Sequence, residues 1–246
     1  TGALTGALKT VQNYPIASGA LTTIKGDFTI LEGSNGAEFE TNNNQLLVAG
    51  NWTNWDASAF KQGTGNVTFN GASPQNLTCA GGERLHAFTL NNTSATGVTI
   101  IGGDLNVDQQ IAFTNGLLNL NSNDLLLGTA TNNALVLGGN TSSYAVVWDG
   151  SANGKIIHQV NNNTDAYYFP MGDDVDFSPA TVDLNSGLIS SARLEGSVIG
   201  LPHPQLGSST NYLNRYWLIE PVGITNPGYN IQFSYATVDA VGPENT

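Results

Sequence analysis

The tightest acidic cluster in the chain lies directly after a predicted strand. Its carboxylates are those of Asp173, Asp174 and Asp176, on a segment that we predict to be a loop. Calcium binds carboxylate and backbone carbonyl oxygens, so such a loop could hold Ca²⁺. The segment lacks the glycine and the distal glutamate of an EF-hand loop, so an ordinary acidic turn is the alternative. The sequence indicates no cofactor besides this calcium ion.

A pair of tryptophans, Trp52 and Trp55, flanks a predicted turn. Exposed indole rings can stack on the apolar faces of sugars while their N–H groups remain hydrated. The pair is therefore the feature that favours a carbohydrate-binding module. The alternative is that the two rings pack over a corner or an end of the fold and bind no ligand.

The first half of the chain contains few residues that could be catalytic. Glycoside hydrolases need paired carboxylates across a cleft, and polysaccharide lyases need a base beside carboxylates that hold calcium. Asp104 and Asp108 are the closest pair of acids there, and we expect both at solvated strand ends. The other acids of this half are mostly single and lie near turns. The sequence therefore favours a non-enzymatic protein and predicts no catalytic residue.

Cysteine and histidine supply no metal or nucleophile motif. The single cysteine, Cys79, cannot form an internal disulfide, and its apolar neighbours predict a buried, inert thiol. The histidines His86, His158 and His203 are far apart in the sequence, and none has the spacing of a zinc site. A zinc centre is therefore unsupported.

Charge is sparse and mostly acidic. Only 11% of the residues are Asp, Glu, Lys or Arg, against roughly 25% in an ordinary soluble domain. The 7 basic residues are scattered among 19 acidic ones, which gives a net charge of −12. Nucleic acids and anionic membranes are bound by clustered Lys and Arg, so neither is an expected partner. No apolar run is long enough for a membrane-spanning helix, and we expect no membrane insertion.

The elements that must position these residues are short strands. Apolar runs alternate with Asn and Gly, which tolerate the left-handed backbone of tight corners. Long Ala-rich or charged stretches typical of helices are absent. The sequence therefore predicts an all-β fold. In the first half we predict strands over 26–30, 45–48, 66–69, 88–90, 97–101, 104–107, 116–120, 124–127 and 134–137.

Three features predict that these strands form a right-handed β-solenoid. The strands are very short, and similar four-residue phrases recur at Gly26, Gly50 and Gly103. Asn recurs at strand ends, where equivalent side chains of successive coils can stack and satisfy the corner backbone. A β-sandwich is the alternative, because the spacing of the strands suits it as well.

The character of the sequence changes near residue 143, where the predicted strands lengthen and aromatics and prolines become more frequent. In the strand predicted over 229–235, Tyr229, Ile231, Phe233 and Tyr235 share one face. Such alternation is typical of a half-buried antiparallel strand. The remaining strands of this half are predicted over 144–148, 154–160, 166–169, 180–184, 192–198 and 214–219.

Two domains follow from this change. We predict β-solenoid repeats over 1–142 and a sandwich-like antiparallel β module over 143–246. A solenoid end exposes unpaired strand edges and an open core, and this module could cap it. Because the chain ends shortly after a predicted strand, we expect the module to be truncated at its C-terminal end.

Several phrases of the chain occur in a familiar order and at familiar distances. They are Gly50–Asn54, Gly63–Gly71, Gln75–Thr78, Phe88–Asn92, Tyr168–Gly172, Phe177–Val182, Asn214–Trp217 and Tyr235–Glu244. Together they resemble a repeat, and the β module that follows it, in large secreted proteins of the Bacteroidota that are exported by the type IX secretion system. The resemblance covers most of the chain from about Lys25 onward. It implies a multidomain, adhesin-like protein at the cell surface, and it transfers no catalytic residue.

The sequence thus predicts a secreted or cell-surface segment of a larger protein, with a structural, adhesin-like role. Its expected partners are other surface or secretion-system proteins, or extracellular glycans. One alternative is a carbohydrate-binding module that uses Trp52 and Trp55. A second alternative is a polysaccharide-cleaving β-helix enzyme.

Overall fold

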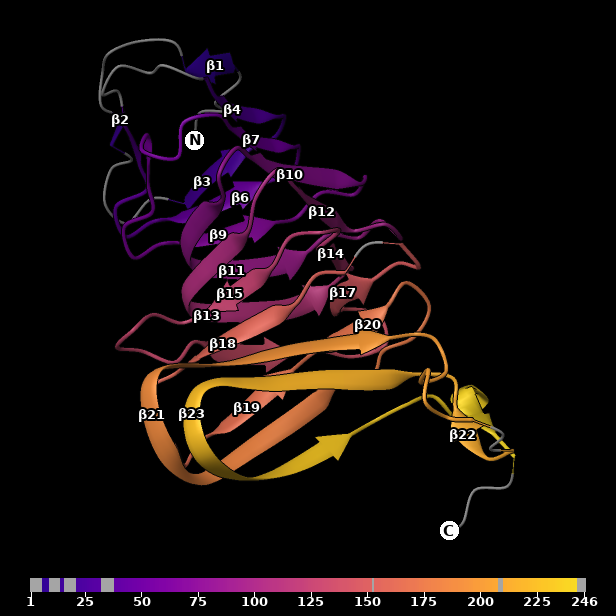
Figure 1. Ribbon diagram of the computed structural model, residues 1–246. Helices are drawn as coiled ribbons and strands as arrows, with labels where there is room; N and C mark the ends of the chain where they lie inside the picture. The colour runs from indigo at the N-terminus through magenta and orange to yellow at the C-terminus, as the bar shows by residue number, and fades with distance from the viewer. Residues whose placement is uncertain are drawn as a thin grey trace.

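The computed structural model describes residues 6–8, 14–15, 21–31, 38–151, 153–207 and 210–242. Most of them lie in strands, and the described part contains one short 3₁₀ helix, η1 (Thr237–Asp239). Figure 1 shows a coil of short strands that ends on two long, strongly bent strands. The predicted all-β fold is confirmed, with a β-solenoid of about six turns followed by an antiparallel module.

One face of the coil is a sheet in which all neighbours are parallel. Phe28 lies opposite Trp52, Trp52 opposite Leu77, and Leu77 opposite Ile100. Equivalent residues of successive coils are therefore stacked in register, as in other solenoids. The strands of this first sheet are, in spatial order, β1 (Gly6–Leu8), β4 (Phe28–Ile30), β7 (Trp52–Asn54), β10 (Gln75–Cys79), β12 (Val98–Ile101), β14 (Leu118–Asn119), β17 (Ala145–Trp148) and β20 (Met171–Asp173).

The second face of the coil is also parallel. Its strands are β3 (Leu21–Ile24), β6 (Gln45–Val48), β9 (Asn66–Phe69), β11 (Glu83–Asn91), β13 (Leu105–Asn115), β15 (Leu125–Leu127) and β18 (Ile156–Val160), and β16 (Leu135–Gly138) also pairs with β13. A short third side is formed by β2 (Tyr14–Pro15), β5 (Phe39–Glu40) and β8 (Phe60–Lys61). After β10 the chain turns into β11 through residues 80–82, so this third side ends at β8.

Side chains at the corners hydrogen-bond to the backbone of the next coil. Oδ1 of Asp27 accepts the N–H of Asn51 at 2.7 Å, and Oδ1 of Asn51 accepts the N–H of Asn76 at 2.8 Å. At another corner, Oδ1 of Asp104 accepts the N–H of Asp124 at 2.8 Å. These bonds satisfy backbone donors that a tight corner would otherwise leave unpaired. They explain why Asn and Asp recur at the strand ends.

The recurring glycines have a packing reason. A Cβ atom on Gly50 would lie 2.6 Å from the backbone nitrogen of Asp27 in the preceding coil. A Cβ atom on Gly103 would lie 2.8 Å from Cα of Gly82. Both distances are too short for any side chain, so at Gly50 and Gly103 the repeated phrase marks points where successive backbones approach closely.

The interior of the coil is filled by a column of apolar side chains. Phe28, Trp52, Phe69 and Phe88 follow one another with ring centroids 4.5, 6.4 and 5.6 Å apart. None of these four residues is more than 3% exposed. Full burial of one such side chain contributes about 1.5–3 kcal/mol. The core is thus continuous from coil to coil.

Two long antiparallel strands close the C-terminal end of the coil. The first, β21 (Ala180–Ile199), pairs with β18, with β19 (Ala166–Phe169) and with β23 (Tyr216–Phe233). We call β21 and β23 together the terminal ribbon. Figure 1 shows both strands, in orange and yellow, bending back on themselves below the last coil. Beyond the ribbon, β22 (Tyr212–Leu213) pairs with β24 (Ala240–Val241).

The ribbon differs from the predicted strands in length. The sequence predicts separate strands over 180–184 and 192–198, and β21 spans both. The pairing register shifts near Ser186 and again between Ile189 and Arg193, and Ser191 adopts a positive φ of 46° in between. Such irregularities bend a strand without ending it. The turn-like residues therefore form bulges instead of a loop.

The parallel pairing continues past residue 142. β17 pairs in parallel with β14, and β18 pairs in parallel with β15. Antiparallel pairing begins where β21 joins β18. The predicted boundary after residue 142 therefore does not coincide with the change in strand pairing, which comes about one coil later.

Candidate functional site

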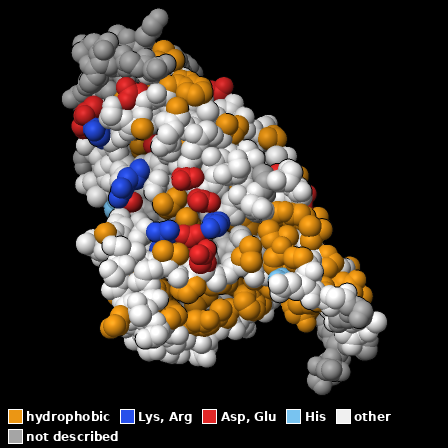
Figure 2. Space-filling model, viewed as in Figure 1, with side chains coloured by type: hydrophobic (Ala, Val, Ile, Leu, Met, Phe, Trp, Pro, Cys, Tyr) orange, Lys and Arg blue, Asp and Glu red, His pale blue; other side chains and the backbone are white. Residues whose placement is uncertain are grey.

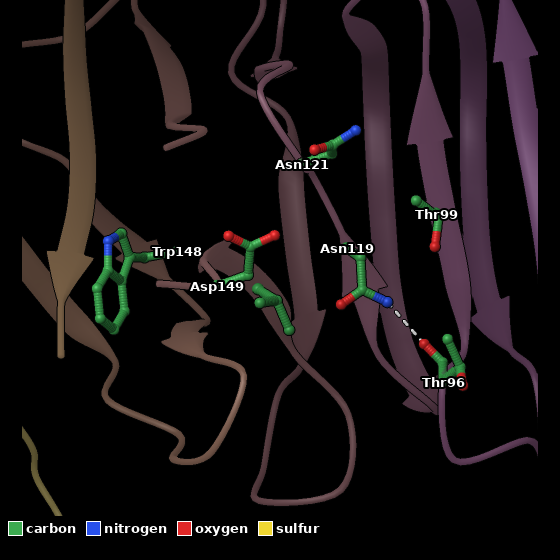
Figure 3. Close-up of a pocket in the computed structure, with 7 residues that line it drawn as sticks. Thr96, Thr99, Asn119, Asn121, Trp148 and Asp149 are labelled. Atoms are coloured by element: carbon green, nitrogen blue, oxygen red, sulfur yellow. Dashed lines mark hydrogen bonds between the residues drawn. The ribbon is translucent and has the colours of Figure 1, made fainter. Parts of the chain in front are cut away.

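The outer side of the first sheet carries a hollow of about 330 Å³, which we call the outer groove. It crosses β12, β14 and β17, and Figure 3 shows the side chains that line it. These residues are Thr96, Thr99, Asn119, Asn121, Val146, Trp148 and Asp149.

Strand alternation turns the central lining residues outward. Thr99 lies opposite Asn119, and Asn119 lies opposite Val146, in the parallel register. Val98, the neighbour of Thr99 in sequence, points inward and is fully buried, because successive side chains of a strand face opposite sides. The coil before β12 continues the outer row with Asn76, which lies opposite Thr99. Polar side chains of three successive coils therefore form a row along the coil axis.

One hydrogen bond sets the orientation of the Asn119 amide. Its Nδ2 atom donates to the backbone oxygen of Thr96 at 2.6 Å. In Figure 3 the Oδ1 atom points the other way, toward the side of the groove on which Asp149 lies. An amide oxygen held in this way can accept a hydrogen bond from a ligand.

Trp148, at the end of β17, stands on the far side of the groove from Thr96 and Thr99 (Figure 3). Its ring is partly exposed. A Cβ atom on Gly200 would lie 2.8 Å from Cζ3 of Trp148, so glycine is needed there to let the ring approach the backbone. One side of the ring thus lies close to the backbone of Gly200.

Asp149 is ordered by its own turn. Its Oδ1 atom accepts the N–H of Ser151 at 2.9 Å and the hydroxyl of Ser151 at 3.0 Å. Among the described residues that line the groove, Asp149 carries the only carboxylate, and none is basic. Glycoside hydrolysis needs two carboxylates across the substrate. The groove is therefore suited to hydrogen bonding and stacking, and its lining residues do not form a hydrolytic pair.

A second hollow, of about 440 Å³, lies at the corner between β8 and β11. Its acid, Glu83, is 3% exposed, and Oε2 accepts hydrogen bonds from Nε1 of Trp52 at 2.8 Å and from Nδ2 of Asn54 at 2.9 Å. Burial raises the pKa of Glu83, although these hydrogen bonds act in the opposite direction. On the rim, Nε of Arg84 is 3.0 Å from Oδ2 of Asp108. These charged groups bind other side chains of the coil.

A third hollow, of about 340 Å³, lies between β16 and β19. His158 borders it, is 3% exposed, and donates from Nε2 to the backbone oxygen of Tyr168 at 2.9 Å. Burial lowers the pKa of His158 to about 4, so the ring is neutral at pH 7. Because the carbonyl can only accept, Nε2 carries the proton. His158 is therefore a structural donor at neutral pH.

The predicted tryptophan pair is not a surface pair. Trp52 is 1% exposed, because β7 turns its ring inward between Phe28 and Phe60, at centroid distances of 4.5 and 4.9 Å. Trp55, which follows β7, is 46% exposed. The prediction that Trp52 belongs to a sugar-binding surface is wrong, and its ring lies in the interior of the coil instead of over a corner or an end of the fold.

The predicted calcium loop surrounds an arginine. Oδ2 of Asp173, at the end of β20, lies 3.5 Å from Nη2 of Arg215, and Oδ2 of Asp176 lies 3.2 Å from the same atom. Oδ2 of Asp239 lies 2.5 Å from Nε of Arg215, whereas Asp174 is exposed. The carboxylates of Asp173 and Asp176 are thus directed at a guanidinium and not at an open metal site. In the described part of the chain, no three His, Cys, Asp or Glu side chains are grouped so as to hold a metal ion.

Arg215 is 4% exposed and stays charged in this cluster. Burial alone would lower the pKa of Arg215, but the hydrogen bond to Asp239 and the charges of Asp173, Asp239 and Asp176 raise it overall. Nη1 of Arg215 also donates to the hydroxyl of Ser178. The cluster therefore links the end of β20 to the residues that flank the ribbon.

The other predicted groups divide between surface and interior. Asp104 lies at an exposed corner, as predicted. Asp108 is 7% exposed and also accepts a hydrogen bond from Nε2 of Gln62 at 2.8 Å, so the prediction of a solvated position is wrong for this residue. Cys79 is buried, as predicted, and burial raises the pKa of its thiol to about 12, which disfavours the reactive thiolate at neutral pH.

Sequence reasoning did not single out the outer groove. Thr99, Asn119 and Trp148 all lie in or beside predicted strands, but their distances along the chain give no sign of proximity. The register between coils brings them together. Alternation within the strand over 144–148 was the available signal, because it puts Val146 and Trp148 on the same face.

Comparisons of the chain with protein-family models, with characterised proteins and with solved structures give no match. Within the described residues, no helix has the length and apolar character needed to cross a membrane. The function is therefore inferred from the residues of this chain and their arrangement.

Proposed function

We propose that this chain is a non-enzymatic, adhesin-like structural segment of a larger protein that is secreted or displayed on a cell surface. The observation that carries the proposal is the parallel pairing that runs from β4 to β20 on one face and from β3 to β18 on the other. Each coil is hydrogen-bonded to the next on two faces. Such a structure is a stiff spacer, able to hold a binding surface away from its point of attachment.

The repeat phrases support an extracellular location. Phrases such as Gly50–Asn54 and Phe88–Asn92 resemble those of type IX secretion substrates of the Bacteroidota. In that setting the partners of the chain are other surface or secretion-system proteins, or extracellular glycans. Its net charge of −12 disfavours nucleic acids as partners.

The positions of the acids support a non-enzymatic role. Glu83 binds Trp52, Asp108 binds Arg84, and Asp104 accepts a backbone N–H of the next coil. Each of these contacts stabilises the coil. A polysaccharide-cleaving enzyme would instead need two carboxylates directed at a glycosidic bond.

The location is tested by brief proteolysis of intact cells that make the full-length parent protein. Peptides of this chain, identified by mass spectrometry in the supernatant, are the expected result, and a cytoplasmic marker protein serves as the control for lysis. Peptides that are released only after the cells are broken would contradict an extracellular location.

The absence of catalysis is tested with a panel of neutral and acidic polysaccharides incubated with the purified chain. We expect no increase in reducing ends and no unsaturated products above a heat-denatured control. Product release that is lost in Glu83→Gln or Asp108→Asn would replace this proposal with the enzyme alternative.

A further inference from the structure

We infer that the outer groove binds a neutral, linear polysaccharide that lies along the coil axis. This assignment rests on the proposed function, because it names the ligand class that an adhesin-like segment would hold. It places the binding surface on β12, β14 and β17, where neither Trp52 nor Trp55 lies.

The spacing of the outer row matches a polysaccharide. Asn76, Thr99 and Asn119 occupy equivalent positions on successive parallel strands. Neighbouring strands lie about 4.8 Å apart, which is close to the length of one pyranose residue in an extended chain. A polysaccharide laid across β10, β12 and β14 would therefore meet one polar side chain per sugar, and at β17 it would meet Val146 in the same row.

The groove also supplies the two kinds of contact that sugars need. Trp148 offers a partly exposed ring, close to the backbone of Gly200, on which the apolar C–H face of a pyranose can stack. Asn119 offers an oriented amide oxygen, and Thr99 offers a hydroxyl that can donate or accept. A β-linked glucan has flat apolar faces and equatorial hydroxyl groups at its edge, and it fits both kinds of contact.

Charge selects against acidic glycans. Among the described lining residues, none is Lys or Arg, and Asp149 adds a carboxylate at the rim. The whole chain carries a net charge of −12. A uronic-acid or sulfated polymer would be repelled by this surface, whereas a neutral polymer would not.

The test is a calorimetric titration of the full chain with cellohexaose, and pull-down on an insoluble neutral β-glucan, with polygalacturonate as the acidic comparator. We expect binding to both neutral probes and none to polygalacturonate. Trp148→Ala should weaken binding about tenfold or more, as for an aromatic residue at the centre of a binding site. Trp55→Ala, which removes an exposed tryptophan outside the groove, should leave binding unchanged.

A second variant covers the case in which Trp148→Ala perturbs folding. Thr99→Val keeps the shape of the side chain and replaces the hydroxyl with a methyl group, so its thermal midpoint should match that of the parent chain. Loss of one hydrogen bond predicts affinity weaker by about three- to tenfold. Trp148→Tyr, which keeps an aromatic platform, should retain most of the affinity that Trp148→Ala loses.

Three results would overturn the assignment. The first is that the chain binds neither of the two neutral probes. The second is that binding survives both Trp148→Ala and Thr99→Val. The third is that the chain binds polygalacturonate more tightly than the neutral probes. The proposed function is judged separately by proteolysis of intact cells. A chain that is released from the surface but binds no glycan would leave the structural role standing without this ligand.

Discussion

The coil and the terminal ribbon bury apolar side chains in different ways. In the coil, Leu77 and Leu105 are fully buried, because equivalent residues of the preceding and following coils cover them. In the ribbon, Phe233 lies opposite the buried Ala180, yet it is 40% exposed. Tyr229 lies opposite the buried Leu184 and is 47% exposed. Burial is thus complete at Ala180 and Leu184 of β21 and incomplete at their partners on β23.

The number of neighbouring strands explains this difference. β21 has a paired strand on both sides at residues 180–183 and 192–196, whereas β23 pairs only with β21 in the described part of the chain. A side chain on a sheet is covered mainly by residues of adjacent strands. In the coil, therefore, each repeat covers the core residues of its neighbours. The bent ribbon ends the series of parallel strand pairs, and it leaves β23 as an edge strand at the end of the molecule.

The polar interactions of the coil also differ from those of the terminal ribbon. The coil uses corner hydrogen bonds of single Asn and Asp residues, whereas the ribbon end holds a cluster of Asp173, Asp176 and Asp239 around Arg215. Figure 2 shows hydrophobic side chains gathered over the lower, ribbon end of the molecule. The two regions should therefore respond differently to substitution and to pH.

The largest effect is expected from Arg215→Leu, at the ribbon end. It leaves Asp173 and Asp239 buried without their cation, and loss of one partner of a buried ion pair costs about 3–5 kcal/mol. Urea unfolding followed by tryptophan fluorescence measures the loss. The control is Arg193→Leu, whose partly exposed ion pair with Glu195 predicts a loss below about 1 kcal/mol. Equal losses of unfolding free energy in the two variants would show that the cluster stabilises the fold no more than a partly exposed ion pair does.

In the coil, Leu105→Ala should lower the free energy of unfolding by about 2–5 kcal/mol, because it opens a cavity in a closed core. Phe233→Ala on the ribbon removes a larger side chain, but that side chain is 40% exposed, so we expect a smaller loss. The same urea titration compares them. A greater loss for Phe233→Ala would mean that the ribbon is as tightly packed as the coil.

Acid should weaken the junction of coil and ribbon through His158. Its folded pKa of about 4 lies below the ordinary value of 6.5, so the stabilisation is full above pH 6.5. It is lost as the pH falls toward 4, by about 3 kcal/mol in total. Unfolding free energies of the parent chain and of His158→Gln, measured from pH 7 to pH 4, should converge as the pH falls. A constant difference between the two would argue against this role of His158.

Within the coil, Glu83 should make the free energy of unfolding depend on pH with the opposite sign. Its folded pKa is raised by burial, so its stabilisation is full below the ordinary value of 4.5 and is lost as the pH rises through the folded pKa. Glu83→Gln should therefore gain stability relative to the parent chain as the pH rises from 4 to 7. A difference that does not vary with pH would exclude this raised pKa.

The smallest effect is expected from Leu188→Ser at the bend of the ribbon. Leu188 is 76% exposed, so its replacement should change the free energy of unfolding by no more than about 0.5 kcal/mol. Leu184→Ser, four residues earlier on the same strand and 1% exposed, should cost far more. Thermal unfolding of the two variants side by side is sufficient to test this. A large loss for Leu188→Ser would indicate that another surface covers the bend.

Local patterns were enough to predict the coil. Short apolar runs between Asn and Gly corners specify a repeating strand and turn, and phrases such as those at Gly26 and Gly50 mark the repeat. The ribbon could not be predicted in the same way. Residues 185–187 have the composition of a turn, and only the long pairing with β23 makes them part of a strand. That pairing is non-local, and nothing in the neighbouring sequence encodes it.

The candidate site was missed for a related reason. Trp52 and Trp148 both occur in short strands, and alternation fixes which residues share a face with each ring. It does not say which of the two faces meets the core. The adjoining coils decide this, and they bury Trp52 while leaving Trp148 partly exposed. The sequence therefore placed the wrong ring, that of Trp52, at the surface.

The corner bonds that run from Asp27 to Asn51 and from Asn51 to Asn76 have one direction along the chain. At this corner each coil presents an acceptor to its successor and offers a backbone donor to its predecessor, so a coil with a suitable corner residue can be followed by another of the same kind. A duplicated stretch of gene that encodes one coil would find matching neighbours on both sides. Lineages could thus lengthen or shorten this protein in steps of one strand spacing, about 4.8 Å, without redesigning either end.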